Sequence, residues 1–285
     1  MPAQAALPAS ADLSPLTPDD LDAAYALTRS LKWPHRREDW QVALAMGQGL
    51  ALRLDGQLAG TILWWFQGAG HATIGLVIVD DAHRGRGLGR LLMEQGLAAC
   101  AGRQILLHAT LAGAPLYLKL GFVPAGHIAQ HQGLPLVTAL DMDDGNVALA
   151  GPEDMDAIFG LDRAASGLDR GDLLAALFSS GRVFTGRADG EVQSYALARP
   201  FGRGYLIGPV VAQTPALARP IIAAACTMLE GQFVRIDVLE DPQLQDWLQS
   251  IGLVGVDRVA AMALGGAPAR AGRPRLVALA SQALG

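Results

Sequence analysis

The stretch that decides the fold reads LVIVDDAHRGRGLGRLL and runs from Leu76 to Leu92. Its first four residues are apolar and are typical of the end of a buried strand. A short polar turn follows, and an apolar-periodic helix is expected over 88–101. Backbone N–H groups at the start of a helix lack intrahelical partners and carry partial positive charge, so they bind anions. The stretch therefore predicts a strand, a loop and a helix, with an anion site at the loop.

Charged and flexible residues in the loop indicate which anion it binds. Arg84, Arg86 and Arg90 add charged donors that suit phosphate oxygens. Three glycines let the backbone approach a ligand closely: Gly85, Gly87 and Gly89. A Walker loop is excluded because no Gly-Lys-Ser or Gly-Lys-Thr triplet follows, and Arg90 stands where a dinucleotide fingerprint would need its third glycine. The residues indicate a pyrophosphate site of another kind.

Length and composition set the frame for this site. The 285 residues correspond to about two domains, and a hydrophobic share of 51% with 17% charged residues excludes a disordered chain. The chain has 22 Lys and Arg residues and 27 Asp and Glu residues, so its formal net charge is 22 − 27 = −5. With no basic domain we expect no nucleic-acid partner, and the one basic cluster (Arg270, Arg273, Arg275) is expected to be a solvated tail.

The cellular compartment is inferred from apolar runs, the N-terminal sequence and the cysteines. No apolar run reaches the ~18 residues that a membrane span needs, so we expect no membrane association. The start lacks the pattern of a secretory signal. Cys100 and Cys226 lie in helical-looking stretches and are expected to be buried free thiols. We therefore place the protein in the cytoplasm; the sequence does not determine an oligomeric state.

The chain is expected to contain the same mixed α/β unit twice. In the first half, helices are expected over 15–31 and 39–46, a hairpin turns at Asp55-Gly56, and strands, helices and a last strand follow from residue 72 onward. The hairpin turn returns at Asp189-Gly190, and Gly121-Phe122-Val123 is echoed by Gly252-Leu253-Val254, 131 residues later. Order and spacing, not identity, carry this inference. The predicted join is a loop near 142–150.

Two blocks, 34 residues apart, resemble the GNAT superfamily of acyl-CoA N-acyltransferases. The phosphate loop of that superfamily reads Arg/Gln-x-x-Gly-x-Gly/Ala, and Arg84, Gly87 and Gly89 fill it in order. The second block, Pro115–Phe122, matches the family segment that ends in Tyr-x-x-x-Gly-Phe. The resemblance implies an α/β fold, a mixed-sheet tandem repeat of two GNAT-like domains. We expect a GNAT domain over 14–142, a degenerate one over 146–265, and tails at 1–13 and 266–285.

The resemblance also implies roles for individual residues. The strand Val77, Ile78 and Val79 would pair with the pantetheine arm of acetyl-CoA, and the loop Arg84, Gly85, Arg86, Gly87, Leu88, Gly89 and Arg90 would hold the pyrophosphate. Tyr117 resembles the family tyrosine that protonates the departing thiolate. Thr110 stands where many members carry an asparagine that contacts CoA. Trp33 and His108 are candidates for contact with the acceptor substrate. His127 and His131 are four residues apart in a segment predicted as strand, and we expect no metal site.

In the second repeat the chemical residues are replaced. Pro215, Ala218 and Pro220 stand at the positions of the loop residues, and Leu248 stands at the position of Tyr117. That half resembles the degenerate C-terminal domain of tandem bacterial acetyltransferases, and we expect it not to bind acetyl-CoA in the usual way. The function implied is an N-acetyltransferase in which a primary amine attacks acetyl-CoA directly; the acceptor is a small molecule or a peptide. A non-catalytic acyl-CoA sensor is the alternative.

Overall fold

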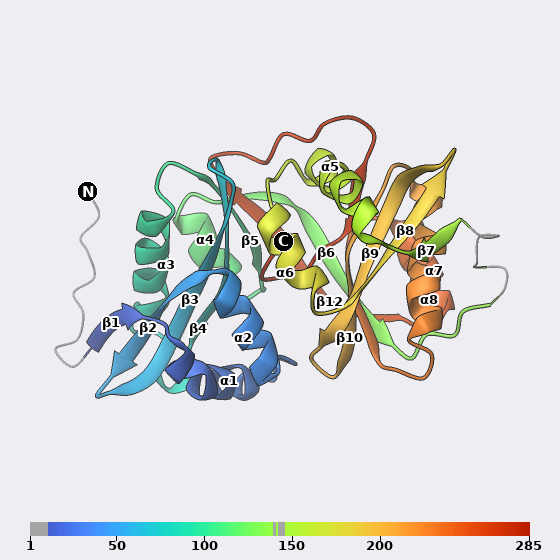
Figure 1. Ribbon diagram of the computed structural model, residues 1–285. Helices are drawn as coiled ribbons and strands as arrows, with labels where there is room; N and C mark the ends of the chain where they lie inside the picture. The colour runs from blue at the N-terminus through green and yellow to red at the C-terminus, as the bar shows by residue number, and fades with distance from the viewer. Residues whose placement is uncertain (1–10, 139–140, 142–145) are drawn as a thin grey trace. The chain divides into compact units, whose positions relative to one another are not determined.

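The computed structural model describes residues 11–138, 141 and 146–285 (Figure 1). Most of the expected tail 1–13 and part of the predicted join at 142–150 lie outside these residues. The chain forms two compact units. The first ends at Ile105 and includes Leu284, and the second runs from Leu106 to Ala283 and includes Gly285. The boundary between these units, at Ile105, differs from the boundary between the two repeats. The domain limits expected from the repeat, 14–142 and 146–265, stay a prediction.

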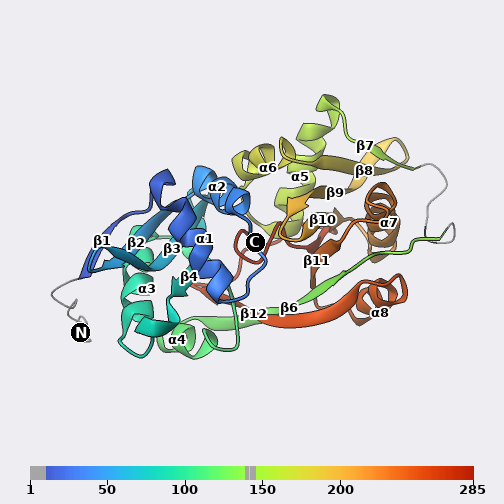
Figure 2. The ribbon, with the colours of Figure 1, turned by 90° about the horizontal axis from the view of Figure 1, so that it is seen from below.

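The first unit contains an antiparallel sheet in the order β1-β2-β3-β4. Its strands are β1 (Ala11–Pro15), β2 (Gln48–Leu54), β3 (Gln57–Gln67) and β4 (His71–Val79). Helices α1 (Leu21–Ser30) and α2 (Arg37–Met46) lie on one face and α3 (Leu88–Ala99) on the other (Figure 2). Asp55 and Gly56, both at positive φ, form the predicted hairpin turn. Trp40, Ile62, Trp65 and Leu92, none more than 1% exposed, form the core of this unit.

The second unit contains a mixed sheet in the order β5-β12-β6-β11-β13-β10-β9-β8-β7. The chain passes from the first unit into the second within β5. The strands are β5 (Gln104–Ala109), β6 (Val123–Gly133), β7 (Val147–Leu149), β8 (Arg182–Ala188), β9 (Glu191–Phe201), β10 (Gly204–Ala212), β11 (Val234–Leu239), β12 (Val254–Leu264) and β13 (Arg275–Ala278).

The helices of the second unit cover both faces of its sheet. They are α4 (Ala114–Lys119), α5 (Met155–Ser166), α6 (Gly171–Phe178), α7 (Ala218–Met228) and α8 (Pro242–Ser250). Helices α5 and α6 lie on one side of β8, β9 and β10, and α7 lies on the other (Figure 2). One-turn 3-10 helices precede several of the α-helices: Pro18–Asp20, Asp81–His83, Pro152–Asp154 and Pro215–Leu217.

The two repeats exchange their last strands. A shift of 131 residues superposes β6 (Val123–Gly133) on β12 (Val254–Leu264). In the sheet, β12 lies beside β5, and β6 lies beside β11, so each strand has left its own repeat for the other. β6 and β12 also pair with each other, from Val123 opposite Ala263 to Gln132 opposite Val254. This exchange explains why the compact units do not follow the sequence repeat.

The C-terminal strand β13 fills a split between β10 and β11. These two strands pair in parallel over Tyr205–Ile207. Beyond a register shift in β10 between Ile207 and Val210, they separate. There β13 pairs antiparallel with Val210–Ala212, and Val238 of β11 lies opposite Ala278. The expectation of a tail at 266–285 is therefore wrong for this segment, because its short apolar run completes the sheet.

Candidate functional site

The loop between β4 and α3 has the open backbone that an anion site needs. Gly85 and Gly87 both adopt positive φ, 76° and 77°, a conformation that costs glycine little and other residues much. A Cβ built at either position would meet no heavy atom within 4 Å. Gly87 is the N-cap of α3, and no side chain caps the helix. The first-turn N–H groups therefore remain for a ligand.

Loop side chains hold this backbone without closing it. The carboxylate of Asp80 accepts a hydrogen bond from the Ala82 N–H at 2.9 Å. Arg84 lies 2.7 Å from the Asp81 carboxylate, and both side chains are more than half exposed, so this ion pair is weak. Arg86 contacts the ring of His83 at 3.2 Å, and Arg90 donates to Glu94 at 2.8 Å. All predicted pyrophosphate residues lie together in the first unit.

The strand before the loop carries a distortion. Leu76 has a positive φ of 50°, and the register of β4 against β3 shifts where Thr61 and Leu63 face Ile78 and Gly75. The Thr61 hydroxyl donates to the Leu76 carbonyl at 2.9 Å and holds the bulge. Ile78 is buried, whereas Val77 and Val79 are half-buried. The predicted pantetheine strand thus leads directly into the loop.

Tyr117 and Thr110 flank the same glycine in the second unit. A Cβ on Gly113 would meet the Tyr117 ring at 3.0 Å and the Thr110 hydroxyl at 3.5 Å. Thr110 accepts hydrogen bonds from the Gly113 N–H through both its carbonyl (3.0 Å) and its hydroxyl (3.2 Å), which begins α4. The Tyr117 ring meets Phe122 edge-on at 6.0 Å. Burial raises the pKa of Tyr117 to about 12, and its hydroxyl has no hydrogen-bond partner among the described residues.

One ring nitrogen of His108 is hydrogen-bonded to the backbone, and the other is not used in that bond. Its Nδ1 lies 2.8 Å from the Gln282 carbonyl oxygen. A carbonyl only accepts, so Nδ1 carries the proton and Nε2 has a free lone pair. Burial lowers the pKa of His108, against the opposing effects of the Gln282 carbonyl and the Asp237 carboxylate. The side chain lines a cavity of about 290 Å³ together with Ser166, Met262 and other residues of this unit.

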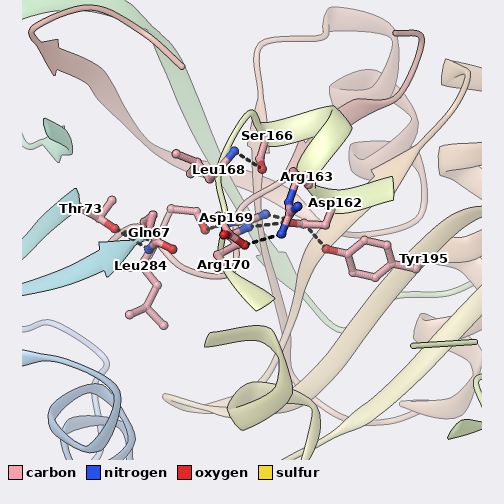
Figure 3. A network of polar contacts seen from close by, with 11 residues as sticks. Gln67, Thr73, Asp162, Arg163, Ser166, Leu168, Asp169, Arg170, Tyr195 and Leu284 are labelled. Carbon is pink, nitrogen blue, oxygen red and sulfur yellow. Dashed lines mark hydrogen bonds and ion pairs between the residues drawn. The ribbon is translucent and has the colours of Figure 1, made fainter. Parts of the chain in front are cut away.

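The segment that holds His108 is itself held by buried arginines, a feature that sequence reasoning missed. Arg170 donates to both carboxylate oxygens of Asp162 at 2.8 and 2.9 Å and to the Gly285 carbonyl at 2.7 Å. Tyr195 also donates to Asp162, and Figure 3 shows both side chains pointing to that carboxylate. Arg199 donates to the Ala280 carbonyl at 3.0 Å. These bonds fix the turn over 280–285 that accepts from His108.

The structure also places Trp33 and His131. Trp33 is half-buried in the segment between α1 and α2, with its ring 5.9 Å from that of His35. The ring of His131 is buried and bonds the Leu253 carbonyl at 3.0 Å. The described residues contain no group of three or more His, Cys, Asp or Glu that could hold a metal ion. They also contain no helix with the length and hydropathy of a membrane span.

In the second repeat, strand β13 lies along part of the β10 edge that corresponds to the expected pantetheine strand of the first repeat. Strand β10 pairs with β9 along one edge. On its other edge it pairs first with β11 and then with β13. Val210, which aligns with Val79, is paired with Ala278 of β13, whereas Gly208 and Pro209, which align with Val77 and Ile78, lie in the register shift between the two pairings. The second repeat thus lacks the arginine and glycines of the phosphate loop, and in the same repeat β13 occupies part of the edge of β10.

Comparisons with known proteins agree with the repeat. Models of an acetyltransferase (GNAT) domain match residues 47–124 and again residues 158–277. The uncharacterized N-acetyltransferase YitH of Bacillus subtilis is 32% identical over 187 residues, a match that spans 63% of this chain and 65% of that protein. A putative acetyltransferase from Pyrococcus horikoshii has a similar fold over 98% of both chains, with a TM-score of 0.80 and 21% identity. A tandem GNAT protein from the clavulanic acid biosynthesis pathway has a TM-score of 0.63 and 17% identity, over 89% of this chain and 98% of that one.

Proposed function

Because the chain belongs to the GNAT family of acetyltransferases, with one such domain in each half, we propose that it transfers an acetyl group from acetyl-CoA to a primary amine. The loop at the start of α3 carries this proposal. Its positive-φ glycines, uncapped first-turn N–H groups and three arginines fit a pyrophosphate. The second repeat lacks these residues, so one acetyl-CoA binds per chain.

His108 acts as the general base. Acetyl-CoA supplies an activated acyl group, and the amine must lose a proton as it attacks. The Nε2 lone pair of His108 is available for that proton because Nδ1–H is held by the Gln282 carbonyl. The lowered pKa of His108 keeps the ring neutral at neutral pH. The side chain is therefore in its basic form before substrate binds.

Tyr117 supplies the proton that the departing sulfur takes up. Because burial raises its pKa to about 12, the phenol is protonated at neutral pH. Thr110, whose hydroxyl lies near the same glycine as the Tyr117 ring, contacts CoA in place of the asparagine common in the family. These two roles rest on the family resemblance together with the observed burial and the absence of a partner for the phenol among the described residues.

The acceptor is a small molecule. The cavity beside His108 has a volume of about 290 Å³, at the lower end of the range for small ligands. Its walls are mixed: Met262, Leu279 and Ile128 are apolar, whereas the Ser166 hydroxyl can bind an amine or hydroxyl group. Both cysteines are buried free thiols, which supports a reducing, cytoplasmic setting for the reaction.

Steady-state release of CoA over a panel of primary amines tests the proposal. Turnover with at least one small amine is expected, together with calorimetric binding of one acetyl-CoA per chain. Replacing Arg84 and Arg86 together by alanine should weaken acetyl-CoA binding at least tenfold, ~1.4 kcal/mol. Binding without turnover on any amine would favour the acyl-CoA sensor instead. Two equivalent acetyl-CoA sites, or unchanged affinity in R84A/R86A, would contradict the placement of the site.

A further inference from the structure

Three arginines of the second unit converge on one cavity. Arg219 lies in the first turn of α7, Arg275 begins β13, and Arg270 lies in the segment before β13. All three line a cavity of about 690 Å³, within the range of small-molecule sites. Its lining comes from the starts of α7 and α8, the end of β11, and β13 with the segment before it. Residues far apart in the sequence thus bring three positive charges to one place.

The acidic residues of the cavity are engaged elsewhere. Glu240 pairs with Arg258 at 2.5 Å and lies 3.6 Å from His127. Asp241 caps α8 by accepting a hydrogen bond from the Leu244 N–H at 3.0 Å. Within the described residues none of Arg219, Arg270 and Arg275 forms an ion pair within 4 Å, although the charge of Arg219 acts on the Asp141 carboxylate, which accepts a hydrogen bond from Trp247. The three guanidinium groups outnumber the two carboxylates that line the cavity, so its lining carries a net positive charge.

Arg219 is already oriented by its neighbours. Its guanidinium donates to the Gln243 carbonyl at 3.0 Å and lies 5.9 Å from the centre of the Trp247 ring. A held guanidinium loses little conformational entropy when it binds an oxyanion. The remaining walls are largely apolar, from Ala218, Leu239, Leu244, Leu276 and Val277. A ligand that matches both parts carries an anionic head and an apolar body.

The position of the cavity explains its charge. Pro215 and Ala218, which line it, are the residues that the repeat aligns with Arg84 and Gly87 of the first-repeat loop. That loop has lost its own arginine and glycines here. Instead, the segment that ends in β13 brings Arg270 and Arg275 to the same place, while β13 itself fills the neighbouring groove. Arginines of this segment thus lie where the first repeat has its loop residues, while β13 occupies part of the edge of β10.

We propose that this cavity is a second ligand site, distinct from the acetyl-CoA loop, that binds a small organic phosphate: a phosphate head between Arg219, Arg270 and Arg275 and a compact apolar body against Leu239, Leu244 and Leu276. The phosphate group suits three arginines because guanidinium pairs its oxygens through two parallel N–H bonds. The cavity shares Leu239, Glu240, Arg270 and Leu276 with the cavity beside His108, but binding of a phosphate there does not require that the first repeat transfers an acetyl group. It gives the second repeat a binding function of its own.

Calorimetric titration with phenyl phosphate tests the proposal on the full chain. The R84A/R86A variant is used as background so that the first-repeat loop does not contribute. Saturable binding of one phenyl phosphate is expected in that background, and R219A/R275A added to it should weaken binding at least tenfold. Both side chains are exposed, so their loss should not change the melting temperature. R182A is the matched control, because Arg182 is an exposed arginine of the same unit that does not line the cavity.

The outcomes separate the parts of the proposal. Absence of saturable binding, or equal affinity with and without Arg219 and Arg275, would overturn the site. Inorganic phosphate that binds as tightly as phenyl phosphate would overturn the apolar part. Loss of binding only in the R84A/R86A variant would show that the probe binds the first-repeat loop. Absence of acetyl transfer would contradict the proposed function and leave this result unchanged.

Discussion

Replacement of Tyr117 by phenylalanine tests how the departing sulfur obtains its proton. An ordinary thiol has a pKa of about 8.5, so its thiolate would be a poor base toward a phenol whose pKa burial raises to about 12. The chain itself shows what burial does to a thiol: it raises the pKa of Cys226 to about 12. Under the proposed function, a CoA thiolate released in comparably buried surroundings would have a pKa close to that of the phenol and would take up its proton.

The size of the effect follows from what the substitution removes. The Tyr117 ring, 9% exposed and packed against Phe122, stays in the variant. Its hydroxyl has no partner among the described residues, so folding loses no hydrogen bond within them. What remains to be lost is a hydrogen bond to a developing charge, about 1.5–3 kcal/mol. This corresponds to a roughly 10- to 150-fold decrease in kcat.

Steady-state kinetics with detection of released CoA measures this prediction. We expect a lower kcat, a KM for acetyl-CoA within about threefold of the wild type, and an unchanged melting temperature. Tyr205→Phe is the matched control, because Tyr205 is a half-buried tyrosine of β10, in the same unit. A kcat within twofold of the wild type in Tyr117→Phe would refute the reasoning and leave Tyr117 as packing only.

Three further predictions concern His108, Arg170 and the strand exchange. His108→Gln keeps a donor for the Gln282 carbonyl but has no basic nitrogen; kcat/KM should fall about 100-fold. In the wild type kcat/KM should fall as the pH drops through the lowered pKa of His108, below 6.5, and this acidic limb should be absent from the variant's pH profile. Arg170→Met leaves the buried Asp162 carboxylate with its Tyr195 hydrogen bond but without a cation, and should lower the free energy of unfolding in urea by about 3–5 kcal/mol. The exposed pair Arg163–Asp169 is its control, and Arg163→Met should cost less than about 1 kcal/mol. A chain that ends before β7 lacks β12, the neighbour of β5, and β11, the neighbour of β6, and should fail to form a soluble monomer with a cooperative melting transition in circular dichroism.

Local signals in the sequence predicted most of what lies near the loop. The two Asp-Gly turns adopt positive φ at Asp55 and Asp189, and the strand, loop and helix around Arg84 form as the glycine spacing indicates. Contacts between distant residues were not predictable in this way. His108 meets Gln282 across 174 positions. β13 is only four residues long, too short to give a periodic pattern.

Buried charge is the second reason why part of the site escaped prediction. Asp162 and Arg170 belong to neighbouring helical segments, where charged residues normally face solvent. Nothing in their spacing of eight residues indicates that each would be at most 2% exposed and that they would hold the turn over 280–285. Only the packing of α5 against β9, β10 and β13 brings them inside.

The strand exchange explains why the second repeat keeps its fold although it lacks the phosphate-loop residues. An exposed strand edge is a site of aggregation, and β12 covers the edge of β5 while β6 covers that of β11. Neither repeat can therefore be lost without exposing the other. The split between β10 and β11 raises the same problem inside the second repeat, because its backbone groups need partners when no ligand supplies them. β13 supplies them from the chain itself at Val210–Ala212. The segment that ends in β13 also carries Arg270 and Arg275, which line the neighbouring cavity. The same segment therefore both pairs with the edge of β10 and brings positive charge to that cavity.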